Sequence, residues 1–177
     1  MGTGIVVCGL NGCGKSTLGR ALADKLEYHF IDIEDLYFAR ACVDAPYCDP
    51  RPRAEVENLL HEEIIKHNDF VFPAVKGDYG DMIQPFYRYA VVIEVPKSIR
   101  EQRVQRRSFQ KFGTRMLEGG DLYHSEEQFF QMIGSRTESY VENWVKSLRC
   151  PVIRVDGTLP LEENVAFIVQ EIMRYQG

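Results

Sequence analysis

The sequence lacks the features of membrane and secreted proteins. Its apolar runs are far shorter than the ~18 residues that a membrane span requires. The first four residues lack the basic stretch of a secretory signal, and the apolar run Ile5–Val7 after them is too short for one. Val6 stands where N-myristoylation needs Ser or Thr. We therefore expect a cytoplasmic protein without a membrane segment.

Cysteine is scarce and shows no ligand pattern. The five cysteines are scattered, and no CxxC pair or Cys/His cluster indicates a zinc site. Their odd number argues against a complete set of disulfides. Five free thiols are typical of a reducing compartment.

An excess of basic residues is also missing. The chain has 21 Lys and Arg against 26 Asp and Glu, a net charge of −5, which argues against a protein that coats nucleic acid. The range 97–115 is the exception, because its only acid is Glu101 and the rest of its charged residues are Lys or Arg. A local basic patch on an acidic chain suits a small anionic ligand, and nothing demands more than a monomer or weak dimer.

Strand-like and helix-like segments alternate along the 177 residues. The length fits one domain, 1–177. Apolar runs predict strands over 5–8, 28–31, 70–75, 89–95 and 151–156. Helical spacing predicts helices over 14–27, 35–43, 53–67, 126–148 and 161–175, together with a basic helix after Pro96. This alternation predicts an α/β fold, a three-layer αβα sandwich around a mostly parallel sheet of five strands.

The strongest motif is Gly9–Ser16, which matches G-x-x-x-x-G-K-[ST] in full. It follows the first strand and precedes a helix, as a phosphate-binding P-loop does. Glycines let successive N–H groups turn toward phosphate oxygens, and the helix N-terminus adds its positive end. We expect Lys15 to contact the β- and γ-phosphates and Ser16 to bind Mg²⁺. The predicted nucleotide-binding residues are Gly9, Asn11, Gly12, Cys13, Gly14, Lys15, Ser16 and Thr17.

The sequence lacks the motifs of other classes of P-loop protein. No Asn-Lys-x-Asp string reads guanine, and no Leu-Ser-Gly-Gly-Gln string marks a transporter ATPase. No run of acidic residues ends the third strand. A chain of this length has little room beyond the core fold, so elimination favours a small kinase.

Further segments resemble the nucleoside monophosphate kinase superfamily, with shikimate- and gluconate-kinase-like and adenylate-kinase-like features. Residues 12–23 are similar to the start of shikimate kinases, and Phe30–Glu34 resembles their Phe-x-Asp-x-Asp segment, with Glu34 in place of the second Asp. Residues 92–96 with Arg103 look like the fourth strand and pre-lid helix of adenylate kinases. Arg136-x-x-x-Tyr140 resembles the post-lid helix of both. The resemblance implies a P-loop fold with a short lid, approximately 107–125.

The resemblance assigns roles on the metal and acceptor sides. Asp32 becomes the metal-side carboxylate, acting with Ser16, and Glu34 an acceptor-side group. Either carboxylate could instead cap the following helix or stabilise its positive N-terminal end. Arg53 and Gly77 become acceptor-binding residues, although Arg53 could simply pair with Glu55 or Glu57.

The resemblance also assigns the adenine side and the lid. Gly157 and Thr158 look like the adenine-side loop. Arg103, Arg107 and Arg136 would contact the transferring phosphoryl group or the acceptor, because a closing lid stabilises charge and excludes water. A row of arginines on a surface helix is also compatible with a solvated face.

Together these features predict transfer of the γ-phosphoryl group of Mg-ATP to a small metabolite or nucleotide, catalysed by Lys15, Asp32, Arg103, Arg107 and Arg136. The predicted cofactors are ATP and Mg²⁺, and the predicted partner is a small-molecule acceptor rather than nucleic acid. Three alternatives stay open. One is a nucleotide-binding ATPase or regulator, and another is a kinase of nucleoside or polynucleotide 5′-hydroxyl groups. The third is a nucleic-acid-processing enzyme, which the net charge of −5 disfavours and the basic range 97–115 permits.

Overall fold

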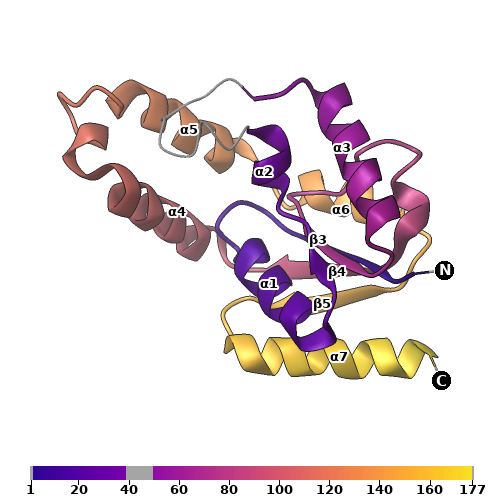
Figure 1. Cartoon of the computed structure of the whole chain (residues 1–177). Helices are drawn as coiled ribbons and strands as arrows, with labels where there is room; N and C mark the ends of the chain where they lie inside the picture. Colours follow the sequence, from indigo (N-terminus) through magenta and orange to yellow (C-terminus); the bar gives the residue numbers. More distant parts are fainter. Residues whose placement is uncertain (1, 39–49, 177) are drawn as a thin grey trace.

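The computed structural model describes residues 2–38 and 50–176. Its sheet has five parallel strands in the order β2-β3-β1-β4-β5. The strands are β1 Gly4–Cys8, β2 His29–Phe30, β3 Phe70–Pro73, β4 Tyr87–Glu94 and β5 Val152–Asp156. This confirms the five predicted strands (Figure 1). β3 ends at Pro73, because proline has no N–H to continue the ladder.

β1 lies between β3 and β4, so the loop after it lies at the middle of the sheet. Val7 pairs with Pro73 on one side, and Cys8 pairs with Val92 on the other. The carboxyl end of β1 therefore faces the crevice where open α/β sheets bind ligands.

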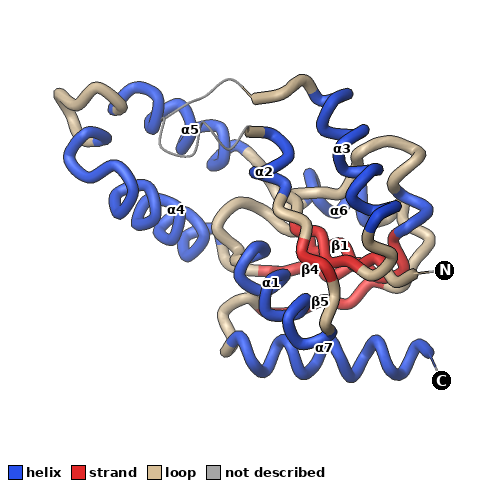
Figure 2. Tube along the Cα trace, viewed as in Figure 1, coloured by secondary structure: helices blue, strands red, loops and turns tan. Residues whose placement is uncertain are grey.

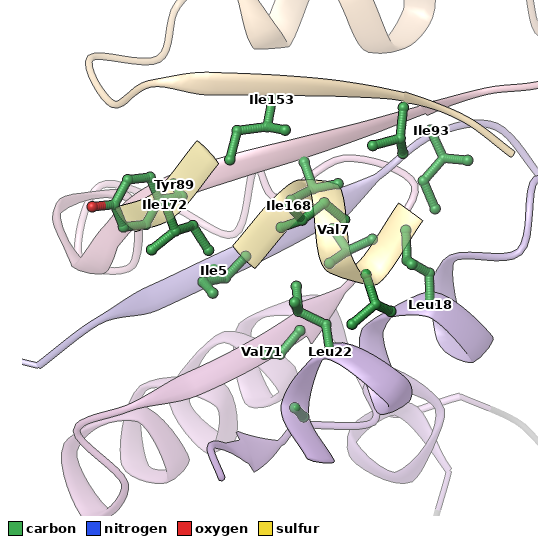
Figure 3. Packing of buried hydrophobic residues seen from close by; sticks show 14 of the residues in the cluster. Ile5, Val7, Leu18, Leu22, Val71, Tyr89, Ile93, Ile153, Ile168 and Ile172 are labelled. Atoms are coloured by element: carbon green, nitrogen blue, oxygen red, sulfur yellow. The ribbon is translucent and has the colours of Figure 1, made fainter. Parts of the chain in front are cut away.

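One face of the sheet is covered by α1 Lys15–Leu26 and α7 Leu161–Gln176. Figure 3 shows Leu18 and Leu22 of α1 and Ile168 and Ile172 of α7 against the apolar side chains of the strands. Burial of this apolar surface is the main force that holds the layer.

The other face is covered by α3 Arg53–Lys66 and α6 Ser139–Val145. Leu60 and Ile64 of α3 pack against Phe70 and Phe72 of β3. Val141 and Val145 of α6 pack against the carboxyl-terminal parts of β1 and β4. Helices on both faces confirm the predicted three-layer α/β sandwich.

A helical hairpin extends from this sandwich. It consists of α4 Lys97–Phe112, the short 3-10 helix η3 Gly113–Met116 and α5 Tyr123–Ser135. Figure 2 shows α4 and α5 projecting beyond the carboxyl ends of the strands, where a lid over the crevice would lie. A second 3-10 helix, η2 Gln84–Phe86, leads into β4. Within the described residues, each helix is too short or too polar to cross a membrane.

Two predicted helices need correction. The expected helix 126–148 is divided into α5 and α6, because Arg136 has the extended backbone angles φ −75° and ψ 123°. The expected helix 35–43 begins earlier, as α2 Ile33–Tyr37, because the Asp32 side chain accepts a hydrogen bond from the Glu34 N–H and so caps it. Its predicted residues 39–43 lie outside the described residues.

Candidate functional site

The P-loop joins β1 to α1 and includes three glycines with positive φ, Gly9 at +149°, Gly12 at +83° and Gly14 at +98°. A Cβ on Gly12 would lie 2.3 Å from the carbonyl oxygen of Arg100, so the start of α4 closes off that side of the loop. A Cβ on Gly14 would meet nothing within 4 Å. The loop is therefore held from behind and open in front of the N-terminus of α1, as a phosphate cradle requires.

Lys15 lies in the first turn of α1, and its ammonium donates to the Leu10 carbonyl at 3.2 Å. Burial lowers the pKa of Lys15, and the positive charges of Arg107 and Arg136 lower it further. Cys13, whose Sγ lies 4.0 Å from Nζ, acts in the opposite direction. Of the five predicted catalytic residues, Lys15, Arg107 and Arg136 are therefore near enough to interact, and all three are cations.

Arg136, directly after α5 of the helical hairpin, contacts the P-loop. Its guanidinium donates to the side-chain oxygen of Asn11 at 2.9 Å, across 125 residues of sequence. The extended backbone between α5 and α6 places this side chain toward the loop. Two predicted residues, one from the P-loop and one from the post-lid segment, therefore meet.

Arg103 reaches the loop after β5. Its guanidinium donates to the Gly157 carbonyl at 3.1 Å. In the same loop the Asp156 carboxylate accepts from the N–H and hydroxyl of Thr158, and these hydrogen bonds lower the pKa of Asp156. The predicted adenine-side residues Gly157 and Thr158 are thus fixed beside Arg103 of α4.

Asp32 and Glu34 follow β2, as expected for residues at the carboxyl edge of the sheet. The Asp32 carboxylate accepts from the Glu34 N–H at 3.0 Å, which is the helix-capping alternative. It also accepts from Arg20 at 3.4 Å. Arg20 lies one turn after Ser16 on α1, so Asp32 faces the part of α1 that carries the predicted metal ligand Ser16. Ser16, Thr17 and Glu34 are exposed.

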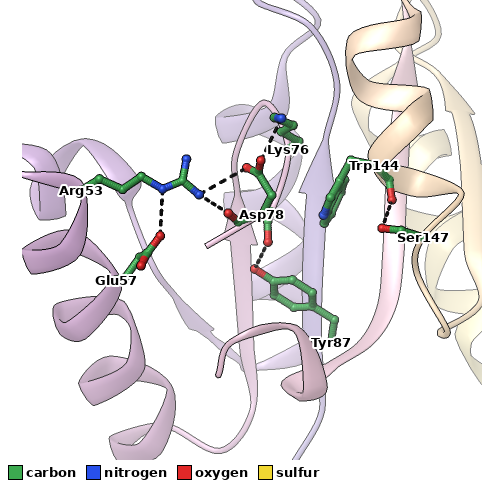
Figure 4. A network of polar contacts seen from close by, with 8 residues as sticks. Arg53, Glu57, Lys76, Asp78, Tyr87, Trp144 and Ser147 are labelled. Atoms are coloured by element: carbon green, nitrogen blue, oxygen red, sulfur yellow. Dashed lines mark hydrogen bonds and ion pairs between the residues drawn. The ribbon is translucent and has the colours of Figure 1, made fainter. Parts of the chain in front are cut away.

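Arg53 lies in a polar network at the start of α3 (Figure 4). Its Nε donates to Glu57 at 2.8 Å, the local pairing that the sequence left open. Its other end donates to the Asp78 carbonyl, and the Asp78 carboxylate accepts from Lys76 at 2.8 Å. Gly77, between these last two residues, is buried, and its carbonyl accepts from the Tyr87 hydroxyl at 3.1 Å.

Lys76 and Tyr140 belong to the same region, but sequence reasoning did not select them as site residues. The Lys76 ammonium lies 4.5 Å from the centre of the Tyr140 ring, and the Arg136 guanidinium lies 5.1 Å from it. Both are cation–π contacts. Tyr140 appears in the Arg136-x-x-x-Tyr140 resemblance, which was the one signal for it; Lys76 had only its place after the third strand.

Arg100 and Arg20 were missed as well. Arg100 is buried behind the P-loop, where its Nε donates to the Val95 carbonyl at 3.0 Å and its guanidinium lies 3.4 Å from Glu138. Its backbone carbonyl is the atom that abuts Gly12. Arg100 is thus a support of the loop, and its position three residues before Arg103 was the available signal.

Comparisons with known proteins agree with this architecture. Uncharacterized protein YqaC of Bacillus subtilis (strain 168) is 25% identical over 169 residues, which cover 91% of this chain and 92% of the relative. A gluconokinase from Sinorhizobium meliloti 1021 superposes with a TM-score of 0.55 at 19% identity, over 99% of this chain and 97% of that one.

Two further solved structures have similar scores. A sugar kinase from Janibacter sp. HTCC2649 has a TM-score of 0.56 at 16% identity, over 96% of this chain and 94% of that one. The deoxyadenosine kinase from M. mycoides, with products dCMP and dCDP bound, has a TM-score of 0.55 at 14% identity, over 97% of this chain and 100% of that one. At these identities the likeness shows the fold alone, an α/β P-loop fold that this chain shares with the three kinases.

A family model described as an AAA domain matches residues 5–121, which is more than half of the chain and includes the P-loop, β2, β3, β4, α4 and η3. On this match, and with the P-loop geometry in agreement, the chain belongs to the AAA domain family.

Proposed function

We propose that this protein is a kinase that transfers the γ-phosphoryl group of Mg-ATP to a small-molecule acceptor. The observation that carries the proposal is the pair of cations at the P-loop, Lys15 in the first turn of α1 and Arg136 hydrogen-bonded to Asn11. Lys15, Arg107 and Arg136 lie close enough for the two arginines to lower the pKa of the lysine. Such mutual repulsion is relieved by a polyanion, and a triphosphate supplies the charge.

The residues of the nucleotide side would have separate roles. Backbone N–H groups from Gly12 to Ser16 would hold phosphate oxygens, and Lys15 would neutralise the β- and γ-phosphates. The Ser16 hydroxyl and the Asp32 carboxylate are oxygen ligands of the kind Mg²⁺ prefers. They are near the same side of α1, because Asp32 accepts a hydrogen bond from Arg20, one helical turn after Ser16. Mg²⁺ bound there supplies charge neutralisation at the β- and γ-phosphates.

The lid arginines supply the remaining charge. Arg107 and Arg136 would contact the transferring group, because the positive charges of both lower the pKa of Lys15. Arg103, which holds the Gly157 carbonyl, would lie at the base of the nucleotide. A lid that closes on these contacts excludes water, which is a competing acceptor.

The acceptor would bind between the P-loop and α3. Arg53, Lys76 and Arg136 present three cations there, held by Asp78, Glu57 and the Tyr140 ring. Cations of this number suit an acceptor with a carboxylate or phosphate group in addition to its hydroxyl. Gluconate, the acceptor that the name of the gluconokinase structure gives, is an acceptor of that kind. Glu34 follows β2 on this side and would orient the hydroxyl, and Gly77 would set the course of the loop.

The test is ADP release from Mg-ATP across a panel of acceptors. The panel contains gluconate, shikimate, each nucleoside monophosphate, nucleosides and a short 5′-hydroxyl oligonucleotide, with water as the blank. We expect one small acidic acceptor to stimulate release far above the blank, and Lys15→Ala to abolish it. Equal release with every compound and with water would refute the kinase assignment and favour an ATPase or regulator. Stimulation by the oligonucleotide alone would favour the 5′-hydroxyl kinase.

A matched pair of variants then tests the acceptor side. Lys76→Gln removes a charge-assisted contact worth about 1.5–3 kcal/mol, so kcat/KM for the acceptor should fall about 10- to 150-fold. Lys25→Gln changes an exposed lysine in the last turn of α1 and should leave kcat/KM unchanged. Equal values for the two variants would exclude Lys76 from the acceptor site.

A further inference from the structure

Two histidines and a glutamate meet at the end of the sheet opposite the P-loop. His29 begins the edge strand β2, Glu63 lies in the last turn of α3, and His67 follows that helix. Glu63 and His67 are four residues apart, so they share one side of the helix end. None of the three belongs to the nucleotide or acceptor groups described above.

The three side chains converge on one point. The Nε2 atom of His29 lies 3.1 Å from Oε2 of Glu63, and the Nε2 atom of His67 lies 3.8 Å from that oxygen. One ligand atom from each residue lies within 4.8 Å of the other two. Metal–ligand bonds of about 2.0–2.2 Å in a tetrahedral site place neighbouring ligand atoms about 3.3–3.6 Å apart, so the observed pair distances bracket what one ion requires.

The backbone holds each ligand in place. The His29 N–H donates to the Asp69 carbonyl at 3.0 Å, and the His67 N–H donates to the Glu63 carbonyl at 3.0 Å. Lys66 lies 3.7 Å from Oε1 of Glu63, which leaves Oε2 toward the two imidazoles. Such a partner for the second oxygen orients a ligating carboxylate.

Access to the site is open. The side chains of His29, Glu63 and His67 are each about one-third exposed, at 34%, 32% and 31%. The two imidazole rings are stacked with centres 3.6 Å apart and planes 13° from parallel. An entering ion would turn the rings apart so that both nitrogens point at it, and water would complete its coordination.

We propose that His29, Glu63 and His67 form a binding site for one divalent transition-metal ion of the zinc class. Two imidazoles and one carboxylate are a donor set that suits Zn²⁺, Co²⁺ and Ni²⁺ better than Mg²⁺ or Ca²⁺, which prefer oxygen ligands. The bound ion ties the edge strand to the end of α3. Its role is structural, because the site lies at the amino end of the strands and the P-loop lies at the carboxyl end.

The test is titration of the nucleotide-free, reduced protein with Co²⁺, followed by visible absorption, with the midpoint of thermal unfolding as a second readout. We expect one Co²⁺ per chain, an absorption band without thiolate charge transfer, displacement by Zn²⁺ and a higher unfolding midpoint with metal. Glu63→Gln and His67→Gln should each weaken binding at least about 10-fold, since even loss of a supporting contact costs 10- to 100-fold.

Two control variants separate the outcomes. His124→Gln changes an exposed histidine of α5 and should bind Co²⁺ as the unchanged protein does. Lys15→Ala should also bind Co²⁺ normally, so failure of the kinase proposal would not affect this result. Circular dichroism checks that each variant is folded. The proposal is overturned if folded His67→Gln binds as tightly as the unchanged protein, if thiolate charge transfer appears, or if Co²⁺ does not bind.

Discussion

Replacing each of two P-loop glycines by alanine should affect different properties of the protein. Gly12 and Gly14 both have positive φ, so alanine costs about 1–2 kcal/mol of backbone strain at either position. At Gly12 the new Cβ also lies 2.3 Å from the Arg100 carbonyl oxygen, and relief of such overpacking costs about 1–3 kcal/mol more. Gly12→Ala should therefore lose about 2–5 kcal/mol of unfolding free energy, and Gly14→Ala about 1–2 kcal/mol.

For nucleotide affinity, in contrast to stability, we expect a large loss from Gly14→Ala. Its Cβ would point into the open space in front of α1, where the phosphates are proposed to lie. Gly14→Ala should accordingly remain folded and lose most of its affinity for ADP.

Thermal unfolding by circular dichroism and calorimetric titration with Mg-ADP measure the two effects. For a chain of this size, 1 kcal/mol shifts the unfolding midpoint by about 2–4 °C, so Gly12→Ala should unfold about 2–12 °C below Gly14→Ala. If Gly14→Ala is the less stable variant, or if it binds Mg-ADP normally, the reasoning from the loop geometry is wrong.

Three further predictions concern ionisable or polar groups. Burial, Arg107 and Arg136 lower the pKa of Lys15 and phosphate would raise it again, so at alkaline pH Mg-ATP binding should take up protons, measured by calorimetry in buffers of different ionisation enthalpy and absent in Lys15→Arg. Tyr87→Phe leaves the buried Gly77 carbonyl without its donor and should lower the unfolding free energy in urea by about 1–3 kcal/mol; no loss would contradict the hydrogen bond. Burial raises the pKa of Cys8 to about 12, so at pH 8 the folded protein should alkylate at Cys8 about 1000-fold more slowly than the unfolded chain, by peptide mass spectrometry.

The P-loop could be predicted from sequence because its geometry is local. Eight consecutive residues, Gly9–Ser16, specify the loop, and the apolar run before them specifies the central strand. The helix and strand order followed in the same way from apolar periodicity. These signals act within a few residues, so no knowledge of distant contacts was needed.

The proposed acceptor side depends on contacts between distant residues. Lys76 meets Tyr140 across 64 positions of sequence, and no periodicity records such a pair. The division between α5 and α6 was missed for a similar reason. Apolar spacing continues through 126–148, whereas the extended backbone at Arg136 accompanies a hydrogen bond to Asn11. Tertiary structure overrides local helix propensity there.

The two halves of the site therefore differ in how freely they can diverge. The P-loop rests on backbone atoms, because Gly12 abuts a main-chain carbonyl and any side chain there displaces a helix. On the acceptor side, Arg53 pairs with Glu57 at the surface, and exposed pairs of this kind contribute only about 0–1 kcal/mol to stability. If the proposed acceptor side is correct, single substitutions there would exchange one substrate for another at almost no cost to folding, and the phosphate donor would stay the same.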